Sequence, residues 1–171
     1  MAANDITLGS GRIYVVEYTG TIPADNVIEA AANQFGYTKG GATLTYETEF
    51  TEVEDDNGDI KEVFLNTDSA TFKCGAFMGN AADIVKICPT ARSTTANGVT
   101  TVSIGGVSND DNKKYLVRFK HKTEPLRVTI VGRNTEGFEL AFSADDAVTL
   151  EPTFTCSAMD GGVLATIKSG E

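Results

Sequence analysis

Residues 43–66 read TLTYETEFTEVEDDNGDIKEVFLN, two alternating runs on either side of Asp56-Asn57-Gly58-Asp59. An Asn-Gly pair between such runs is the strongest short-range signal for a β-hairpin, and it favours a type I′ turn. The segment is therefore predicted to be one long β-hairpin. Pairing outward from the turn sets Glu54 opposite Lys61, Val53 opposite Glu62 and Phe50 opposite Leu65.

The predicted hairpin is long for its domain. Residues 43–54 would extend about 40 Å at roughly 3.3 Å per residue. That is close to the diameter, roughly 40 Å, of a compact domain of this length. Leu44, Tyr46 and Phe50 can pack on the domain, whereas the distal half cannot. Because an isolated two-stranded hairpin is marginally stable in water, the distal half needs another surface to lie on.

The distal half is also strongly acidic. Eight carboxylates stand against one lysine, a net charge of −7, in the set Glu47, Glu49, Glu52, Glu54, Asp55, Asp56, Asp59, Glu62 and Lys61. We expect the tip of this hairpin to contact another subunit through Glu52, Glu54, Asp55, Asp56, Asn57, Gly58, Asp59, Lys61 and Glu62.

A basic run follows between Lys113 and Arg133, with seven cations against Glu124 and a net charge of +6. Acidic and basic segments on one chain suggest either a fold-back or a head-to-tail contact between copies, which builds rings or filaments. The candidate acceptors are Lys113, Lys114, Arg118, Lys120 and Arg127. The alternative is that the acidic hairpin is a solvated loop without a partner. If assembly does not depend on ionic strength, pairing between the acidic and basic segments is not its cause.

The rest of the chain reads as one mainly β domain over residues 1–171, with two packed antiparallel sheets in a sandwich or barrel. Strands are predicted near residues 12–18, 42–54, 60–66, 70–76, 99–104, 114–120, 126–131, 149–156 and 163–167, with a weaker signal at 138–142. One short helix is predicted over residues 81–88, with Asn80 as N-cap, Asp83 in a capping-box position and Pro89 as its end. Residues 25–34 are a second helix candidate, or a loop with one helical turn.

The composition and the scattered Cys and His residues argue against several classes of function. A net charge of −10 argues against a basic clamp on nucleic acid. No apolar run is long enough to span a membrane, and the first residues lack a signal-peptide pattern, so we expect a cytoplasmic protein. Cys74, Cys88 and Cys156 fit neither a zinc site nor a disulfide framework. His121, the only histidine, has no nucleophile context, so we expect no enzyme.

No cofactor or metal site is expected either. Residues 55–59 resemble the start of a calcium loop, but the sixth position is Ile60 and the twelfth is Asn66, where such a loop needs Gly and Glu.

Several strings occur in an order typical of one protein family. They are Gly9-Ser10-Gly11-Arg12-Ile13-Tyr14-Val15, Gly20-Thr21-Ile22-Pro23, Gly36-Tyr37-Thr38-Lys39-Gly40-Gly41, Gly79-Asn80 before the helix, Ser103-Ile104-Gly105-Gly106, Tyr115-Leu116-Val117-Arg118-Phe119, Arg127-Val128-Thr129-Ile130-Val131-Gly132, Gly137-Phe138-Glu139-Leu140-Ala141-Phe142 and Thr149-Leu150-Glu151-Pro152-Thr153-Phe154. In this order and spacing, over most of its length, the chain resembles the major tail-tube proteins of long-tailed bacteriophages.

The resemblance implies a structural subunit of the virion tail that assembles in the bacterial host cytoplasm. Such proteins form hexameric rings that stack into a hollow tube around a tape-measure protein, between tail-tip and terminator proteins. The tube later conducts DNA without binding it specifically. The polar face formed by Thr45, Glu47, Glu49 and Thr51 is then a candidate lining of the lumen, and an inter-subunit disulfide through one of the three cysteines stays open.

Three other interpretations are weighed against the non-contractile tail tube. The inner tube of a contractile tail or a related injection machine shares the implied fold. A β-sandwich that binds carbohydrate would also be acidic, but such modules usually present exposed aromatic side chains and this chain has no Trp. A hydrolase lacks a nucleophile–base pair.

Overall fold

A computed structural model describes residues 9–58, 60–77, 80–140, 142, 145 and 147–170, and within these the side chains of residues 60 and 61 are left undescribed. The protein is mainly β, with 53% of residues in strands and 13% in helices, arranged as a large antiparallel sheet and a small two-stranded one. The sequence predicts a mainly β fold of two packed antiparallel sheets, sandwich- or barrel-like, with one short flanking helix and a long protruding hairpin. The mainly β class with two sheets and few short helices is confirmed, and the second sheet is a small hairpin.

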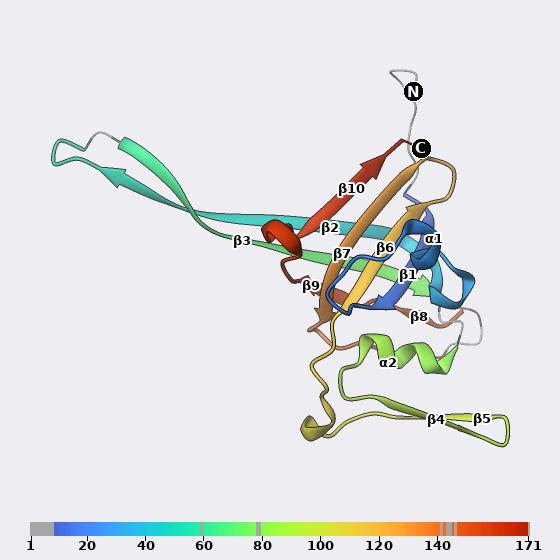
Figure 1. Cartoon of the computed structure of the whole chain (residues 1–171). Helices are drawn as coiled ribbons and strands as arrows, with labels where there is room; N and C mark the ends of the chain where they lie inside the picture. The colour runs from blue at the N-terminus through green and yellow to red at the C-terminus, as the bar shows by residue number, and fades with distance from the viewer. Residues whose placement is uncertain are drawn as a thin grey trace.

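The large sheet curls into a barrel (Figure 1). Its strands are β1 (Gly11–Glu17), β2 (Gln34–Glu54), β3 (Ile60–Phe77), β6 (Tyr115–His121), β7 (Leu126–Asn134), β8 (Thr149–Leu150), β9 (Thr153–Cys156) and β10 (Ala165–Ser169). They run in the order β10-β7-β6-β1-β2-β3-β8, and β9 pairs with both β3 and β7. The circuit β1-β2-β3-β9-β7-β6 therefore closes on itself, which removes most exposed edges.

Two apolar clusters hold the barrel together. The larger fills the interior and includes Ile13, Phe72, Val117, Ile130 and Phe154, all at most 2% exposed. The smaller lies on the outer face of β1, β6 and β7, where Ile28 packs with Tyr14, Leu116, Val131 and Met159. Neighbouring positions on β6 therefore face different clusters, as strand alternation requires.

Gly132 allows the barrel to close. A Cβ built at this position would lie 2.2 Å from the backbone oxygen of Thr155 on the paired strand β9. Only glycine permits this close backbone approach. The closure of β7 against β9 therefore depends on a residue without a side chain.

The helical segments are short. They are α1 (Asp25–Ile28), η1 (Ala31–Asn33), η2 (Ala81–Asp83), α2 (Ile84–Ile87), η3 (Val107–Asn109) and η4 (Asp160–Gly162). The predicted helix at 81–88 is present as η2 followed by α2, and Asn80 caps it by accepting a hydrogen bond from the Ala82 amide at 3.0 Å. Asp83 instead binds Lys86 at 3.0 Å. None of the described helices could span a membrane.

A second hairpin, β4 (Arg92–Ala96) with β5 (Val99–Ser103), lies below the barrel in Figure 1. Its turn is Asn97-Gly98, where φ is +52° and +77°. Positive φ at both central residues defines a type I′ turn. Strand β4 was missed in the sequence because all five residues of RSTTA are exposed, so it has no apolar alternation.

Five of the predicted strands need correction. Strand β2 begins at Gln34, and the predicted strands at 60–66 and 70–76 are one strand, β3. The predicted strand at 149–156 is divided into β8 and β9 around Pro152, which has no amide hydrogen for the ladder. Residues 138–140 and 142 lie in no strand, so that weaker prediction is wrong for them.

Asn134 joins three parts of the fold. Its side-chain nitrogen donates to the carbonyl oxygens of Ile87 at 2.8 Å and Gly137 at 2.7 Å. Its side-chain oxygen accepts from the Thr153 amide at 3.2 Å. The residue is 6% exposed, so water does not replace these bonds if the amide is lost.

We expect Asn134→Ala to lower the free energy of unfolding by about 2–4 kcal/mol, since it leaves buried backbone groups unsatisfied and opens a cavity. Urea denaturation monitored by circular dichroism measures this. Asn109→Ala, in an exposed loop, is the control, and an equal loss in the two variants would contradict the role of Asn134.

Candidate functional site

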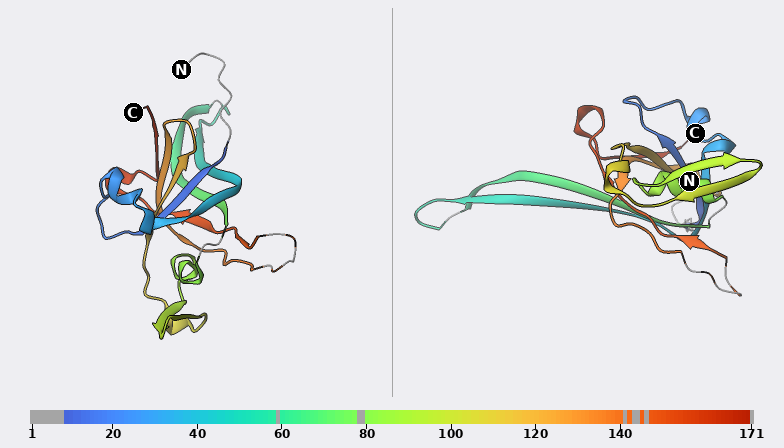
Figure 2. Two further views of the ribbon diagram at one scale, coloured as in Figure 1. Left: turned by 90° about the vertical axis from the view of Figure 1, so that its right-hand side faces the viewer. Right: turned by 90° about the horizontal axis from the view of Figure 1, so that it is seen from below.

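The site is the part of the long hairpin that leaves the barrel. Strand β9 pairs with β3 only over Thr71 to Lys73. From Tyr46 opposite Ala70 outward, β2 and β3 pair with each other alone. We call residues 46–70 the arm. Figures 1 and 2 show that it projects from one side of the barrel, while α1 lies on the opposite side.

The register confirms two of the three predicted pairs. Phe50 lies opposite Leu65 and Val53 opposite Glu62. Glu54 lies opposite Ile60, so its predicted pairing with Lys61 is wrong. A register shift falls between Val53 and Glu54.

The turn explains that shift. The Gly58 amide donates to the Asp55 carbonyl oxygen at 3.0 Å, and the Asp55 side chain accepts from the Asn57 amide at 3.1 Å. Only Gly58 of the predicted Asn-Gly pair has positive φ, at +82°. The predicted type I′ turn is therefore replaced by a wider turn that begins at Asp55. Asp59 lies outside the described residues.

The two faces of the arm differ in chemistry. Directly opposed residues share a face. One face continues the barrel interior, and we call it the apolar face after its exposed apolar set of Tyr46, Phe50, Val63 and Leu65; it also carries Thr48, Glu52 and Asp68. The other carries the predicted lumen residues Thr45, Glu47, Glu49 and Thr51, all exposed, together with Glu62, Val53 and Phe64, and we call it the acidic face.

The apolar face is not covered by the barrel. Phe50 is 55% exposed and its partner Leu65 is 52% exposed. With Val63 on the same face they form a contiguous exposed apolar patch, and such patches are typical of interaction sites. On the acidic face, Thr67 donates to Glu49 at 3.1 Å and Asn66 donates to Thr51, so that face is a hydrogen-bonded polar surface.

The predicted basic acceptors do not form one surface. Arg118 is 1% exposed on the outer face of β6, under α1. Its guanidinium binds Asp25 at 2.7 Å, Glu29 at 3.4 Å and the Thr129 hydroxyl at 3.0 Å. The prediction that Arg118 is a surface acceptor is therefore wrong, because cross-strand pairing and α1 bury it.

Lys120 and Arg127 belong to the same ion-pair cluster. Both bind Glu29, Arg127 at 2.6 Å, and Lys168 binds Asp25 at 3.4 Å. We call these six residues the α1 cluster: Asp25, Glu29, Arg118, Lys120, Arg127 and Lys168. Neither acid of the cluster was identified in the sequence as a partner of these cations, and Lys168 was not identified as part of it.

The cluster lowers the pKa of both acids. The hydrogen bond from Arg118 is the main cause for Asp25. Burial alone would raise the pKa of Glu29, but the hydrogen bonds from Lys120 and Arg127 outweigh it and the pKa falls. Both carboxylates therefore stay ionised at neutral pH.

Lys113 and Lys114 lie at the other end of β6. Lys113 binds Glu17 at 3.1 Å and Asp111 at 3.7 Å, and Lys114 is exposed. The predicted acceptor surface is thus divided between two ends of the barrel.

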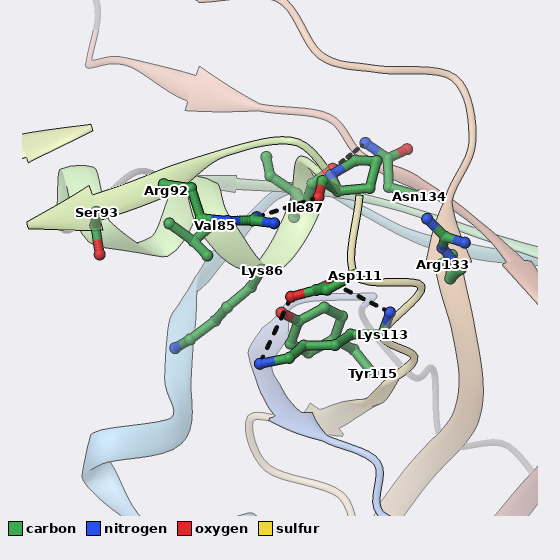
Figure 3. Close-up of a pocket in the computed structure, with 11 residues that line it drawn as sticks. Val85, Lys86, Ile87, Arg92, Ser93, Asp111, Lys113, Tyr115, Arg133 and Asn134 are labelled. Atoms are coloured by element: carbon green, nitrogen blue, oxygen red, sulfur yellow. Dashed lines mark hydrogen bonds and ion pairs between the residues drawn. The ribbon is translucent and has the colours of Figure 1, made fainter. Parts of the chain in front are cut away.

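A cavity of about 210 Å³ beside α2 is lined by Lys86, Arg92, Lys113 and Arg133 (Figure 3). Its cations have acidic or carbonyl partners: Lys86 binds Asp83, Arg133 binds Asp110 at 2.7 Å, and Arg92 donates to the Ala91 carbonyl at 2.8 Å. With Glu17 and Asp111 included, four acids balance the four cations. The cavity is therefore electrically neutral as a whole.

Cys74 and Cys156 are poor nucleophiles. All three are free; Cys74 and Cys88 are buried and Cys156 is half-buried. Burial raises the pKa of Cys74 to about 12 and that of Cys156 to about 11. Both thiols stay protonated at neutral pH, where only the thiolate is reactive. Among the described residues, no three His, Cys, Asp or Glu side chains are grouped to hold a metal ion.

No family model matches this chain, and no curated protein matches it. The arm, the α1 cluster and their charges therefore carry the functional argument.

Proposed function

We propose that this protein is a structural subunit that assembles with copies of itself into stacked hexameric rings, which form the tail tube of a long-tailed bacteriophage. The observation that carries the proposal is the uncovered apolar face of the arm. An arm that ends in water with Phe50 and Leu65 half exposed gains stability only when a partner covers it.

Self-assembly is the simplest source of that partner. The arm projects away from its own barrel, so one copy cannot cover it by folding back (Figures 1 and 2). A contact between unlike surfaces of identical subunits repeats from copy to copy and generates rings or filaments. Both edges of the arm also carry backbone groups that pair with no other strand of the described chain.

The acidic face of the arm fits a conduit for DNA. Glu47, Glu49 and Glu62 share that face, and the whole chain has a net charge of −10. A lumen wall of carboxylates repels phosphate, so DNA slides past without binding. In this arrangement the apolar face contacts the neighbouring subunit and the acidic face lines the lumen. The inner tube of a contractile tail places the same demands on the subunit.

The test of the proposal is assembly of the purified protein. We expect rings or tubes in negative-stain micrographs as the concentration rises, and a mass several times that of the 18.1 kDa chain in light scattering. Replacing residues 53–62 by a two-residue Asn-Gly turn keeps Glu52 opposite Val63 and should leave a folded monomer that does not polymerise, because the barrel core lies outside the arm.

The wild-type protein and the shortened variant test different parts of the proposal. A wild-type protein that stays monomeric up to millimolar concentration contradicts self-assembly. Tubes formed by the shortened variant would show that the subunits assemble through another surface. Circular dichroism of the shortened variant, unchanged except for the lost strand signal, is the control for folding.

A further inference from the structure

Beside the turn between β6 and β7 lies an open hollow of about 490 Å³. We call it the turn hollow; its lining includes Asp25, Lys120, Lys122, Glu124, Leu126 and Arg127. We propose that the turn hollow is the docking site for the acidic tip of the arm of a second copy of this chain. This inference rests on the proposed self-assembly and adds the surface on which the arm lies.

The turn hollow is chosen because its net charge is opposite to that of the arm. In the α1 cluster, four cations meet two acids, which leaves a net charge of +2. Lys122 and Glu124, which also line the hollow, cancel each other. The cavity beside α2, by contrast, is neutral. Of these two hollows, counted with their ion-pair partners, the turn hollow is the one with surplus positive charge for an arm that carries Glu52, Glu54, Asp55 and Asp56.

The surplus charge is accessible. Arg118 is sealed under α1, but the Lys168 side chain is 52% exposed and that of Lys120 is 38% exposed. Lys122 is also exposed. These three lysines present ammonium groups to solvent, while the buried guanidinium holds Asp25 and Glu29. Lys120 and Lys168 also bind Glu29 and Asp25, but the cluster holds two more cations than acids, so these exposed lysines can share a further carboxylate.

The positions of the two surfaces suit a head-to-tail contact. The arm leaves the barrel on one side, and α1, which borders the turn hollow through Asp25, lies on the other (Figures 1 and 2). If each copy is related to the next by the same rotation or translation, every arm can reach the same surface of its neighbour. Such a head-to-tail contact between unlike surfaces is heterologous. A tip on the side opposite to the hollow cannot reach the hollow of its own barrel.

Apolar groups accompany the charges on both surfaces. Leu126 lines the turn hollow, and Val27 of α1 is half exposed beside the cluster acids. Val53 and Val63 lie among the acids near the tip of the arm and are also half exposed. A contact that buries apolar side chains inside a ring of opposite charges excludes water from the charges, and this strengthens their attraction.

Two charge-reversed variants test the contact. The arm variant is Glu52→Lys with Glu54→Lys, and the hollow variant is Lys122→Glu with Lys168→Glu. All four positions are exposed, and the one ion pair that is lost, Lys168 with Asp25, is a surface pair of small worth. At 50 mM salt, each variant alone should need at least 10-fold more protein than wild type to form rings or tubes.

An equimolar mixture of the two variants should assemble near the wild-type concentration. In the mixture, each basic arm meets an acidic hollow and each acidic arm meets a basic hollow. The matched control is Lys73→Glu with Lys114→Glu, which changes the net charge equally and pairs an exposed lysine with one that forms only a surface ion pair. The control should assemble like wild type and should not rescue the arm variant.

The outcomes distinguish this inference from the proposed function. If wild type forms tubes and the hollow variant forms them equally well, the tube stands and the docking site is wrong. Failure of the mixture to assemble would show that these two surfaces do not meet. If wild type forms no rings or tubes at all, the self-assembly itself is contradicted.

Discussion

Phe50→Thr together with Leu65→Thr is expected to raise the concentration needed for assembly by roughly 10- to 100-fold. Full burial of such a side chain is worth about 1.5–3 kcal/mol, and here about half of each remains to be buried. The pair therefore contributes about 1.5–3 kcal/mol to each contact, and every 1.4 kcal/mol is tenfold in affinity. Sedimentation and light scattering over a concentration series measure the threshold.

The folded monomer should not be affected by this change. Phe50 and Leu65 contact no core cluster, and threonine favours strands, so the free energy of unfolding should stay within about 0.5 kcal/mol of wild type. Thr45→Ser with Thr67→Ser, on the acidic face of the hairpin, is the matched control and should assemble normally. Assembly of the Phe50/Leu65 variant at the wild-type concentration would mean that the apolar face is not an interface.

Removing both acids of the α1 cluster is expected to destabilise the monomer by about 3 kcal/mol or more. In Asp25→Ala with Glu29→Ala, the Arg118 guanidinium stays buried with no carboxylate among its described contacts. Leaving one charge of a buried ion pair uncompensated carries a penalty of roughly 3–5 kcal/mol. For a chain of this length, 3 kcal/mol lowers Tm by about 6–12 °C, which calorimetry measures.

Adding Arg118→Met should restore at least about half of that loss, although it removes a further residue of the network. The methionine takes away the uncompensated charge and keeps an apolar side chain under α1. A triple variant less stable than the double variant would show that the acids act by packing of α1 and not by compensating Arg118.

The pH dependence of unfolding also tests whether Asp25 and Glu29 stabilise the monomer through their charges. Both acids have a lowered pKa in the folded protein, so their stabilisation is complete above the unfolded pKa of about 4. It is lost as the pH falls through the lower folded values. The deficit of the double variant relative to wild type should therefore shrink as the pH falls below about 4. A deficit that does not change with pH would contradict the ionic mechanism.

Local patterns were enough to predict the hairpin, its acidic side and most strands. The alternation in residues 43–66 fixes which side chains share a face, and Phe50 and Leu65 meet as the pattern requires. The pattern failed where it was absent or misleading. Strand β4 has polar side chains on both faces, and the turn at Asp55 is set by a side-chain hydrogen bond that an Asn-Gly pair does not reveal.

The acceptor surface could not be predicted in the same way. A run of positive charges between Lys113 and Arg133 gives no information on which cations are buried or neutralised. Arg118 lies 93 residues from Asp25 and 89 from Glu29 in the chain, and Lys168 lies 143 from Asp25. These contacts exist only because the closed barrel brings α1 over β6 and places β10 beside β7.

The sequence by itself determined a mainly β chain with one hairpin too long and too acidic for its own domain, because side-chain alternation and turn residues act over a few positions. The tertiary structure decided where that hairpin leaves the barrel, so that its apolar face is uncovered, and which basic residues remain to receive a partner. Burial and ion pairing depend on distances between segments far apart in the chain, and these distances are set only when the barrel closes.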